Sequence, residues 1–366
     1  MPKLRSVGLI LTALAAVVAV VGARPYAGGW NDASRLAAAE GLVDHGGWSI
    51  DDSIFVNPAL TPPGAPLPFA ASNRLLLERG TLDRLLIDGR FVSDKTPVSS
   101  LLLAGQYWSL QQAAGLVMRR DADRTIYWLT LLSAGTSFVA AVWLMFVLAS
   151  RLSDSAWLAA GLTLSFAFAT CAPAYSRHVN AHVIALAACA AVMCLVDAVA
   201  RNGCTPRRGF GVGTLAGVVY GLDAGLGPIV AIAAGVFMGA RCRACLWPYL
   251  AALVPWMALQ HALNWHIGQT VAPLSSVPAY LTWPGSPFDS ASMSGRYTHE
   301  TVGDVVSYSL DLIAGRRGYL LHNLPLLMLP VASWRLVRLR RRLPEWPAVA
   351  FALSVSAATW MIYALV

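Results

Sequence analysis

The chain has 366 residues, of which 57% are hydrophobic and only 13% are charged. With a mean hydropathy of +0.57, it has too little charge to cover a soluble surface and too many long apolar runs for a single core, which excludes an ordinary soluble enzyme. The sequence predicts an all-α, multi-span membrane protein with no nucleic-acid partner, despite a net charge of +8.

A helix that crosses a bilayer needs about 20 apolar residues. Apolar runs of that kind predict spans at residues 6–23, 126–149, 156–174, 181–200, 246–263, 319–334 and 347–366. Lys3 and Arg5 precede the first run as in a signal peptide, but its length favours a retained anchor. The last span reaches Val366, which suggests a short family member or an incomplete chain.

Two further stretches decide the topology. Residues 97–118 are interrupted by polar side chains such as Gln106, which suits a helix lying at the membrane interface. Residues 209–239 are too long for one span and contain Asp223, a residue that is costly at the bilayer centre. We therefore expect two short spans that meet at a polar turn, residues 221–228.

These assignments give nine spans, an inside N-terminus and outer segments at residues 24–125, 175–182, 221–228 and 264–318. All seven histidines and sixteen of the nineteen acids then fall at or beyond the outer face. We expect a single transmembrane domain, residues 1–366, in a bacterial-type plasma membrane. The long first loop, 24–125, would contain juxtamembrane helices, and chemistry would occur on the outer side.

The cysteines give no framework for a site. Cys204, Cys242 and Cys245 are assigned to the inner side, and none of the six cysteines falls in an outer loop. The spacing of Cys242 and Cys245 suits a redox or zinc pair, but no second pair completes a site. We expect reduced thiols without a functional role.

The first outer loop is the richest in candidate chemistry. Asp32 and Arg35, one helical turn apart, stand near its start, and Asp94 and Lys95 stand at its end. The acid is suited to take a proton, and the cations are suited to stabilise a departing phosphate. An alternative is that Asp32 and Arg35 form an ordinary helix-surface pair.

Nucleotide-binding glycine loops and the serine-hydrolase elbow are absent from the sequence. Four short segments instead resemble the GT-C class of polytopic glycosyltransferases, in the family 39 branch that contains protein O-mannosyltransferases and the lipid A aminoarabinose transferase. They are NDASRLA at 31–37, GRFVSDKTP at 89–97, YSRHVN at 175–180 and GRRGYLLHN at 315–323.

The resemblance implies a GT-C-like fold and a sugar donor carried on a polyprenyl phosphate. It implies that Asp32 is the catalytic acid in the first loop, with Arg35 beside it, and that Lys95 belongs to an acid-Lys-Pro-Pro segment. Val98 replaces the second proline of that segment, and Asn180 stands where the family has an aspartate after its third span.

From these observations we expect an inverting glycosyltransferase that needs no cofactor or metal and has Asp32 as general base. The acceptor would be a lipid, a glycan or a protein. A polytopic transporter or lipid flippase, or a catalytically silent assembly partner, is the alternative. The donor phosphate would be held by Lys95, Arg177, Arg316 and Arg317. A supporting shell would comprise Asp94, His178, Asn180 and His182.

Two of these assignments have simpler alternatives. His178 and His182 have metal-ligand spacing, although histidines at the end of a span more often satisfy local polar groups. Arg316 and Arg317 would also suit interfacial anchors that extend to lipid headgroups. A metal held by Asp94 with His261 or His266 is a further, less favoured arrangement.

Overall fold

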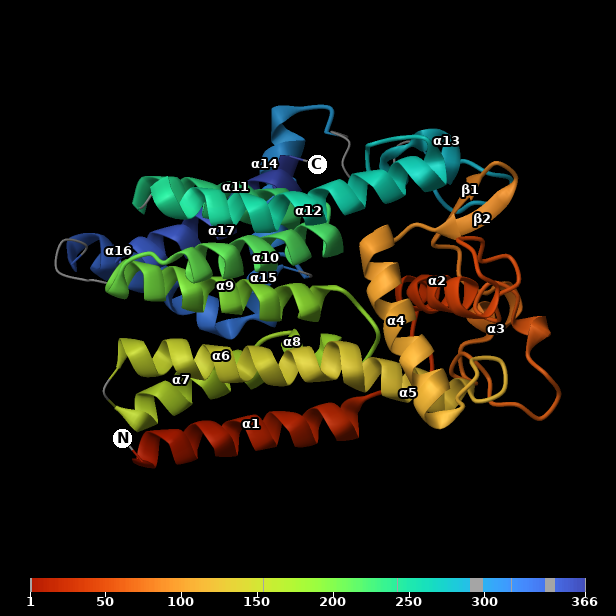
Figure 1. Cartoon of the computed structure of the whole chain (residues 1–366), viewed down its shortest axis with the longest axis horizontal. Helices are drawn as coiled ribbons and strands as arrows, with labels where there is room; N and C mark the ends of the chain where they lie inside the picture. The colour runs from red at the N-terminus through yellow and green to blue at the C-terminus, as the bar shows by residue number, and fades with distance from the viewer. Residues whose placement is uncertain are drawn as a thin grey trace.

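The computed structural model describes residues 2–153, 155–241, 243–289, 299–316, 318–339 and 346–365. Long helices lie side by side along its longest axis (Figure 1). They are α1 (Pro2–Gly22), α6 (Thr136–Leu152), α7 (Ala156–Phe168), α9 (His182–Asn202), α10 (Pro206–Leu222), α11 (Leu226–Arg241), α12 (Arg243–Gly268), α16 (Leu329–Leu339) and α17 (Trp346–Leu365).

Four helices are long and apolar enough to cross a membrane: Arg5–Gly22, Ala122–Leu152, His182–Asn202 and Trp346–Leu365. The second of these runs through α5 (Ala122–Thr130), a π-helical turn η2 (Leu131–Gly135) and α6 without a break. By length and composition, four of the nine expected spans are thus supported. The 13 residues of α7 extend only about 20 Å, less than the roughly 30 Å of a bilayer's hydrocarbon core.

The two ambiguous stretches have the predicted local form. α10 and α11 are separate helices that meet at Asp223. α4 (Pro97–Ala114) does not run along the bundle but lies across one end of it (Figure 1). By contrast, residues 319–334 do not form one helix and are divided among α15 (Tyr319–His322), η4 (Leu324–Met328) and the start of α16. Pro325 and Pro330 have no amide hydrogen to donate, so each falls near the start of a new helical segment.

The end of the bundle crossed by α4 carries most of the first loop (Figure 1). Its helices are α2 (Trp30–Asp44), η1 (Pro58–Leu60) and α3 (Arg74–Arg79), and η3 (Leu274–Ser276) and α13 (Pro278–Leu281) belong to the later loop. α2 is buried from Asp32 to Gly41 and is surrounded by apolar side chains including Ile54, Phe55 and Tyr107. This packing makes α2 a rigid platform. Two short helices complete the described elements: α8 (Ala172–Tyr175) and α14 (Val302–Ala314).

An antiparallel hairpin departs from the expected all-α fold. Strands β1 (Arg84–Ile87) and β2 (Arg90–Ser93) are joined by Asp88 and Gly89, whose φ angles of 49° and 76° are both left-handed. An Asp-Gly pair favours this two-residue turn. The hairpin leads directly into Asp94 and Lys95, so it helps to position them.

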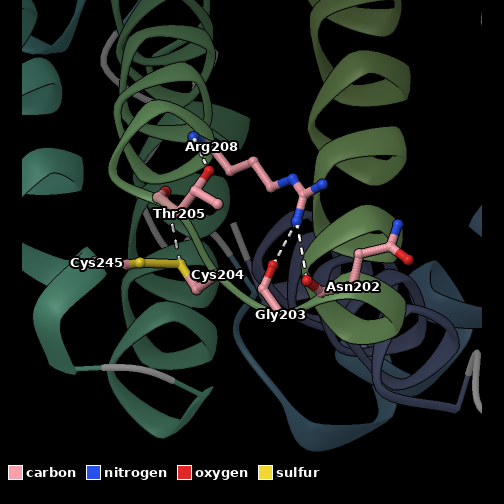
Figure 2. The surroundings of a disulfide bond; sticks show 6 residues. All are labelled: Asn202, Gly203, Cys204, Thr205, Arg208 and Cys245. Carbon is pink, nitrogen blue, oxygen red and sulfur yellow. Dashed lines mark hydrogen bonds between the residues drawn. A yellow bond between two sulfur atoms is a disulfide. The ribbon is translucent and has the colours of Figure 1, made fainter.

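The opposite end of the bundle contains a disulfide between Cys204 and Cys245 (Figure 2). This corrects the expectation of reduced thiols for Cys204 and Cys245, whereas Cys171, Cys189 and Cys194 are free. α10 packs so closely on α12 that a Cβ on Gly209 would lie 2.7 Å from the carbonyl oxygen of Cys245, which brings the loop before α10 against the start of α12. Cys242 lies outside the described residues.

Candidate functional site

The start of α2 holds Asp32 in a defined position. Gly29 precedes the helix in an extended conformation, and the Asp32 carboxylate accepts hydrogen bonds from the amides of Gly28, at 2.6 Å, and Gly29, at 2.8 Å. These bonds satisfy amides that have no partner within a helix. Because an ionised carboxylate has about four lone-pair sites, Asp32 keeps capacity to accept a further proton donor.

His178 lies against the same carboxylate. Its Nδ1 atom is 3.5 Å from Oδ2 of Asp32, and within the described residues that nitrogen has no hydrogen-bond partner. The contact is thus an ion pair when the ring is protonated, without hydrogen-bond geometry. Gly28 makes the approach possible, since a Cβ there would collide with the imidazole.

Arg35 is buried beneath Asp32, with 8% of its surface exposed. Its guanidinium donates to Ser99 Oγ at 3.1 Å and, through Nε, to Asn31 Oδ1 at 3.4 Å. Burial lowers the pKa of Arg35, whereas the carboxylates of Asp94, Asp223, Asp32 and Asp83 raise it. Arginine still remains charged at neutral pH, so the site has a fixed cation at its base.

The start of α2 and the end of β2 are in contact. The hydroxyl of Ser34, between Asp32 and Arg35, lies 2.7 Å from the Ser93 hydroxyl and donates to Asp94 Oδ1 at 2.9 Å. Neither serine was singled out from the sequence. Their contact joins the N-terminal turn of α2 to the end of β2.

Lys95 is paired with two acids. Its Nζ atom lies 2.7 Å from Asp94 Oδ2 and 2.9 Å from Asp83 Oδ2, and only 10% of its side chain is exposed. Burial, followed by the neighbouring Asp94, raises the pKa of Asp83. The trio has a formal charge of −1 when both acids are ionised. An anionic ligand would therefore have to compete with Asp83 and Asp94 for this lysine.

The connection into α9 supplies two more of the predicted residues. Asn180 donates to the carbonyls of Tyr175 and, at 2.8 Å, His178, and accepts from the Val183 amide at 3.1 Å, so it fixes the start of α9. His182 Nδ1 lies 3.8 Å from Asp223 Oδ2. Asp223 was not predicted as a site residue. The break between α10 and α11 at this acid places its carboxylate beside His182 and near enough to Arg35 to raise the pKa of that guanidinium.

Two of the remaining predicted cations, Arg177 and Arg316, make no hydrogen bond or ion pair with this group among the described contacts. The buried Nε atom of Arg177 has no hydrogen-bond partner within the described residues, and its carbonyl accepts from the Arg24 amide at 3.0 Å. Arg316 is exposed after α14, and no described contact joins it to Asp32 or Lys95. Arg317 lies outside the described residues.

Two adjacent cavities lead from the outside of the bundle to Arg35. The inner one, of about 30 Å³, is lined by Arg35, Ser99 and Asn180, and the outer one, of about 340 Å³, by Gly105, Ser109 and Leu132. Both are bordered by Leu102, Gln106, Ser133 and Ile184. We call this pair the α4–α9 groove. Its walls are mostly apolar, and the π-helical turn η2 contributes Ser133; such turns are frequent at functional sites.

The less favoured metal arrangement has no counterpart in the described contacts. His261 interacts with the Tyr220 hydroxyl at 2.8 Å and the Val271 carbonyl at 2.7 Å, not with Asp94. Among the described residues, no group of three or more His, Cys, Asp or Glu side chains is arranged to hold a metal ion.

The described molecule is therefore a helical protein with membrane-length apolar helices and a polar cluster at one end. Comparison with protein-family models, curated proteins and solved structures finds no match for this chain.

Proposed function

We propose that this protein is a membrane glycosyltransferase of the GT-C type, which transfers a sugar from a polyprenyl-phosphate donor to an acceptor hydroxyl. The observation that carries the proposal is the contact between the two ends of the first loop through Ser34, Ser93 and Asp94. That contact gathers an acid with open acceptor capacity, a buried arginine and a lysine. These are the groups that such a transfer requires.

The donor would enter through the α4–α9 groove. Its apolar walls suit a hydrocarbon chain, and Arg35 at its inner end suits a phosphate. Arg177, whose Nε atom has no hydrogen-bond partner within the described residues, is a second candidate. Lys95 would contribute once the phosphate displaced one of its two carboxylate partners.

The reaction would be a single displacement. The acceptor hydroxyl gives its proton to Asp32 while its oxygen attacks the anomeric carbon of the sugar. The bond from that carbon to the phosphate oxygen breaks, and the electron pair leaves with the polyprenyl phosphate. Attack opposite the leaving group inverts the anomeric centre. Arg35 and Lys95 would stabilise the charge that develops on the phosphate.

We further propose that nine segments cross a plasma membrane, with residues 319–334 crossing as the successive segments α15, η4 and α16 and not as one helix, and that the Asp32 end faces outward. Arginines flank the helices in the short connections at the other end, which the positive-inside rule assigns to the cytoplasm because it counts short connections and not a long loop such as residues 24–125. They include Arg5 at the start of α1, Arg151 at the end of α6, Arg207 and Arg208 in the first turn of α10, Arg241 at the end of α11 and Arg243 at the start of α12.

One observation favours a catalytically silent assembly partner. Asp32 acts as a helix-capping group, and Lys95 is already neutralised by acids. These are contacts that a purely structural cluster would also make. A flippase would use the α4–α9 groove without cleaving the donor, so donor cleavage separates the transferase from both alternatives.

The test is release of polyprenyl phosphate from synthetic polyprenyl-phosphate sugars by purified protein in lipid nanodiscs, with a membrane extract as acceptor source. We expect release by the native protein and by Asp123→Asn, and loss of release in Asp32→Asn. Thermal unfolding of each variant separates a catalytic effect from a lost cap, which costs about 1 kcal/mol. Equal release by Asp32→Asn and the native protein would refute the proposed base.

A further inference from the structure

A second cavity lies on the same end of the molecule, outside the Asp32 cluster. It has a volume of about 740 Å³ and is formed by the loop after α2, the β1–β2 hairpin and the end of α12. Its polar lining consists of His45, Ser49, Asp51, Asp52, Asp88, Arg90 and His266, with Trp48 among them. We call it the hairpin groove. Neither the sequence nor the proposed mechanism assigns it a role.

Trp48 is held rigidly at this groove. It packs on a buried cluster that includes Leu85, Ile87 and Val92 from the hairpin. The same segment is fixed to β2, because the Ile50 amide donates to the Phe91 carbonyl at 2.8 Å and the Phe91 amide donates to Asp51 at 3.2 Å. The indole is therefore an ordered aromatic surface beside the polar lining.

Several polar groups of the lining are available to a ligand. Within the described part of the chain, the carboxylates of Asp52 and Asp88 make no hydrogen bond or ion pair, and neither do the side chains of His45, Arg90 and His266. Carboxylates accept from hydroxyl groups, and arginine and histidine donate to them. An open groove with such groups around one aromatic ring matches a ligand that is polar at its edges and apolar on one face, as a sugar ring is.

The groove lies one strand length from the proposed reaction site. β2 runs from Arg90, in the groove lining, to Ser93, which contacts Ser34, two residues after Asp32 in α2. At about 3.3 Å per residue, Arg90 lies roughly 10 Å along the strand from Ser93. One sugar ring is too short to fill the groove and also reach Asp32, whereas a short chain of sugars is long enough.

We propose that the hairpin groove binds the acceptor and that the acceptor is a glycan chain, held on Trp48 with its terminal hydroxyl directed toward Asp32. This inference rests on the proposed glycosyl transfer for its meaning, but binding itself is measurable without the donor. Three ionised acids, Asp51, Asp52 and Asp88, and one arginine, Arg90, give the groove a formal charge of −2 with neutral histidines, which disfavours an anionic ligand, so a cationic peptide is the competing ligand class that the experiment must exclude.

The experiment is saturation-transfer NMR on the full-length protein in nanodiscs, with neutral tetrasaccharides of glucose, mannose and N-acetylglucosamine as probes and tetralysine as the competing ligand class. We expect at least one tetrasaccharide to bind. Asp52→Asn and Trp48→Ala should weaken that binding at least about tenfold, as expected for a lost hydrogen bond to a charged group or a lost stacking surface. Trp48→Phe, which keeps an aromatic packing group, should bind more tightly than Trp48→Ala.

The matched controls are Glu78→Gln on exposed α3 and Trp157→Ala on α7, where the indole is 87% exposed. Both should bind as the native protein does. Binding of tetralysine alone, no binding of any probe, or equal loss in the controls would overturn the groove assignment. If glycan binding maps to the groove but Asp32→Asn keeps full transfer, the proposed base fails while the groove assignment stands.

Discussion

The side chains of Asp32 and His178 lie close together, with Nδ1 of the histidine 3.5 Å from Oδ2 of the aspartate, and the His178 ring lies against Gly28. The two residues come from the first loop and from the connection before α9, and 146 positions separate them in the sequence. The carboxylate is also fixed by the amides of Gly28 and Gly29. Its orientation is therefore set by three neighbours, which is the arrangement expected of a base that must face a substrate in one direction.

Gly28→Ala tests whether this contact matters. The added methyl group would collide with the His178 ring and push it away from Asp32. We expect polyprenyl-phosphate release to fall by about tenfold to a hundredfold, the usual effect of a small displacement near reacting groups. Gly161→Ala in α7, where a Cβ meets nothing within 4 Å, is the control and should keep full activity. Unchanged activity in Gly28→Ala would exclude a role for His178.

Removing Lys95 and removing its partner Asp83 should change the KM for the donor in opposite directions. Lys95→Ala should raise KM for the donor and lower kcat, because the cation would act on the phosphate before and during its departure. Asp83→Asn should lower KM for the donor by up to about fivefold, because it removes a competing partner worth up to about 1 kcal/mol. Initial rates over a range of donor concentrations measure both. A higher KM in Asp83→Asn would mean that Asp83 positions Lys95 instead of competing for it.

The burial of the Glu40 carboxylate predicts that the stability of the first loop depends on pH. Its carboxylate is fully buried, accepts from Ser53 Oγ at 2.6 Å and the Ile54 amide at 3.1 Å, and lies 3.6 Å from Arg119. Burial raises the pKa of Glu40 from 4.5 to about 7, against the opposing effect of the Ser53 hydrogen bond. The folded state thus favours the protonated acid more than the unfolded state does.

The stabilising contribution of Glu40 is then complete below pH 4.5 and is lost as the pH rises through 7. The difference amounts to roughly 3 kcal/mol. Glu40→Gln keeps an oxygen for Ser53 and Ile54 but does not ionise. Thermal unfolding of the native protein and this variant should therefore agree near pH 4.5 and diverge toward pH 8, with the variant the more stable. Parallel curves across this range would contradict the assignment.

The orientation in the membrane is tested by labelling. In a variant without native cysteines, a single cysteine at Asp88 should react with an impermeant maleimide added outside intact cells, and one at Thr205 should react only after the membrane is opened. Outside labelling at position 205 would reverse the proposed orientation. In the proposed orientation, Cys204 and Cys245 of the native chain face the reducing cytoplasm, so their disulfide should form only after the cells are disrupted.

Much of this architecture was predictable from the sequence because it depends on local chemistry. Length and polarity predicted the break between α10 and α11 at Asp223 and the separate orientation of α4. The hairpin was missed, although its Asp88-Gly89 turn is a strong local signal. Its two strands have four residues each and show no alternation of apolar and polar side chains.

Other features depend on contacts between distant segments. The pairing of Cys204 with Cys245 arises from the packing of α10 on α12, and the pairing of Lys95 with Asp83 from the fold of the hairpin. No spacing rule predicts either. The contacts of Ser34 with Ser93 and Asp94 were likewise identified only from the structure, because they depend on how the hairpin packs against α2.

The most direct test of the central claim is a structure of the protein with a non-transferable polyprenyl-phosphate sugar analogue. The account predicts the lipid chain in the α4–α9 groove, the phosphate within hydrogen-bonding distance of Arg35, Lys95 or Arg177, and the anomeric carbon facing Asp32. A phosphate bound away from all three of these cations, with the sugar remote from Asp32, would contradict it.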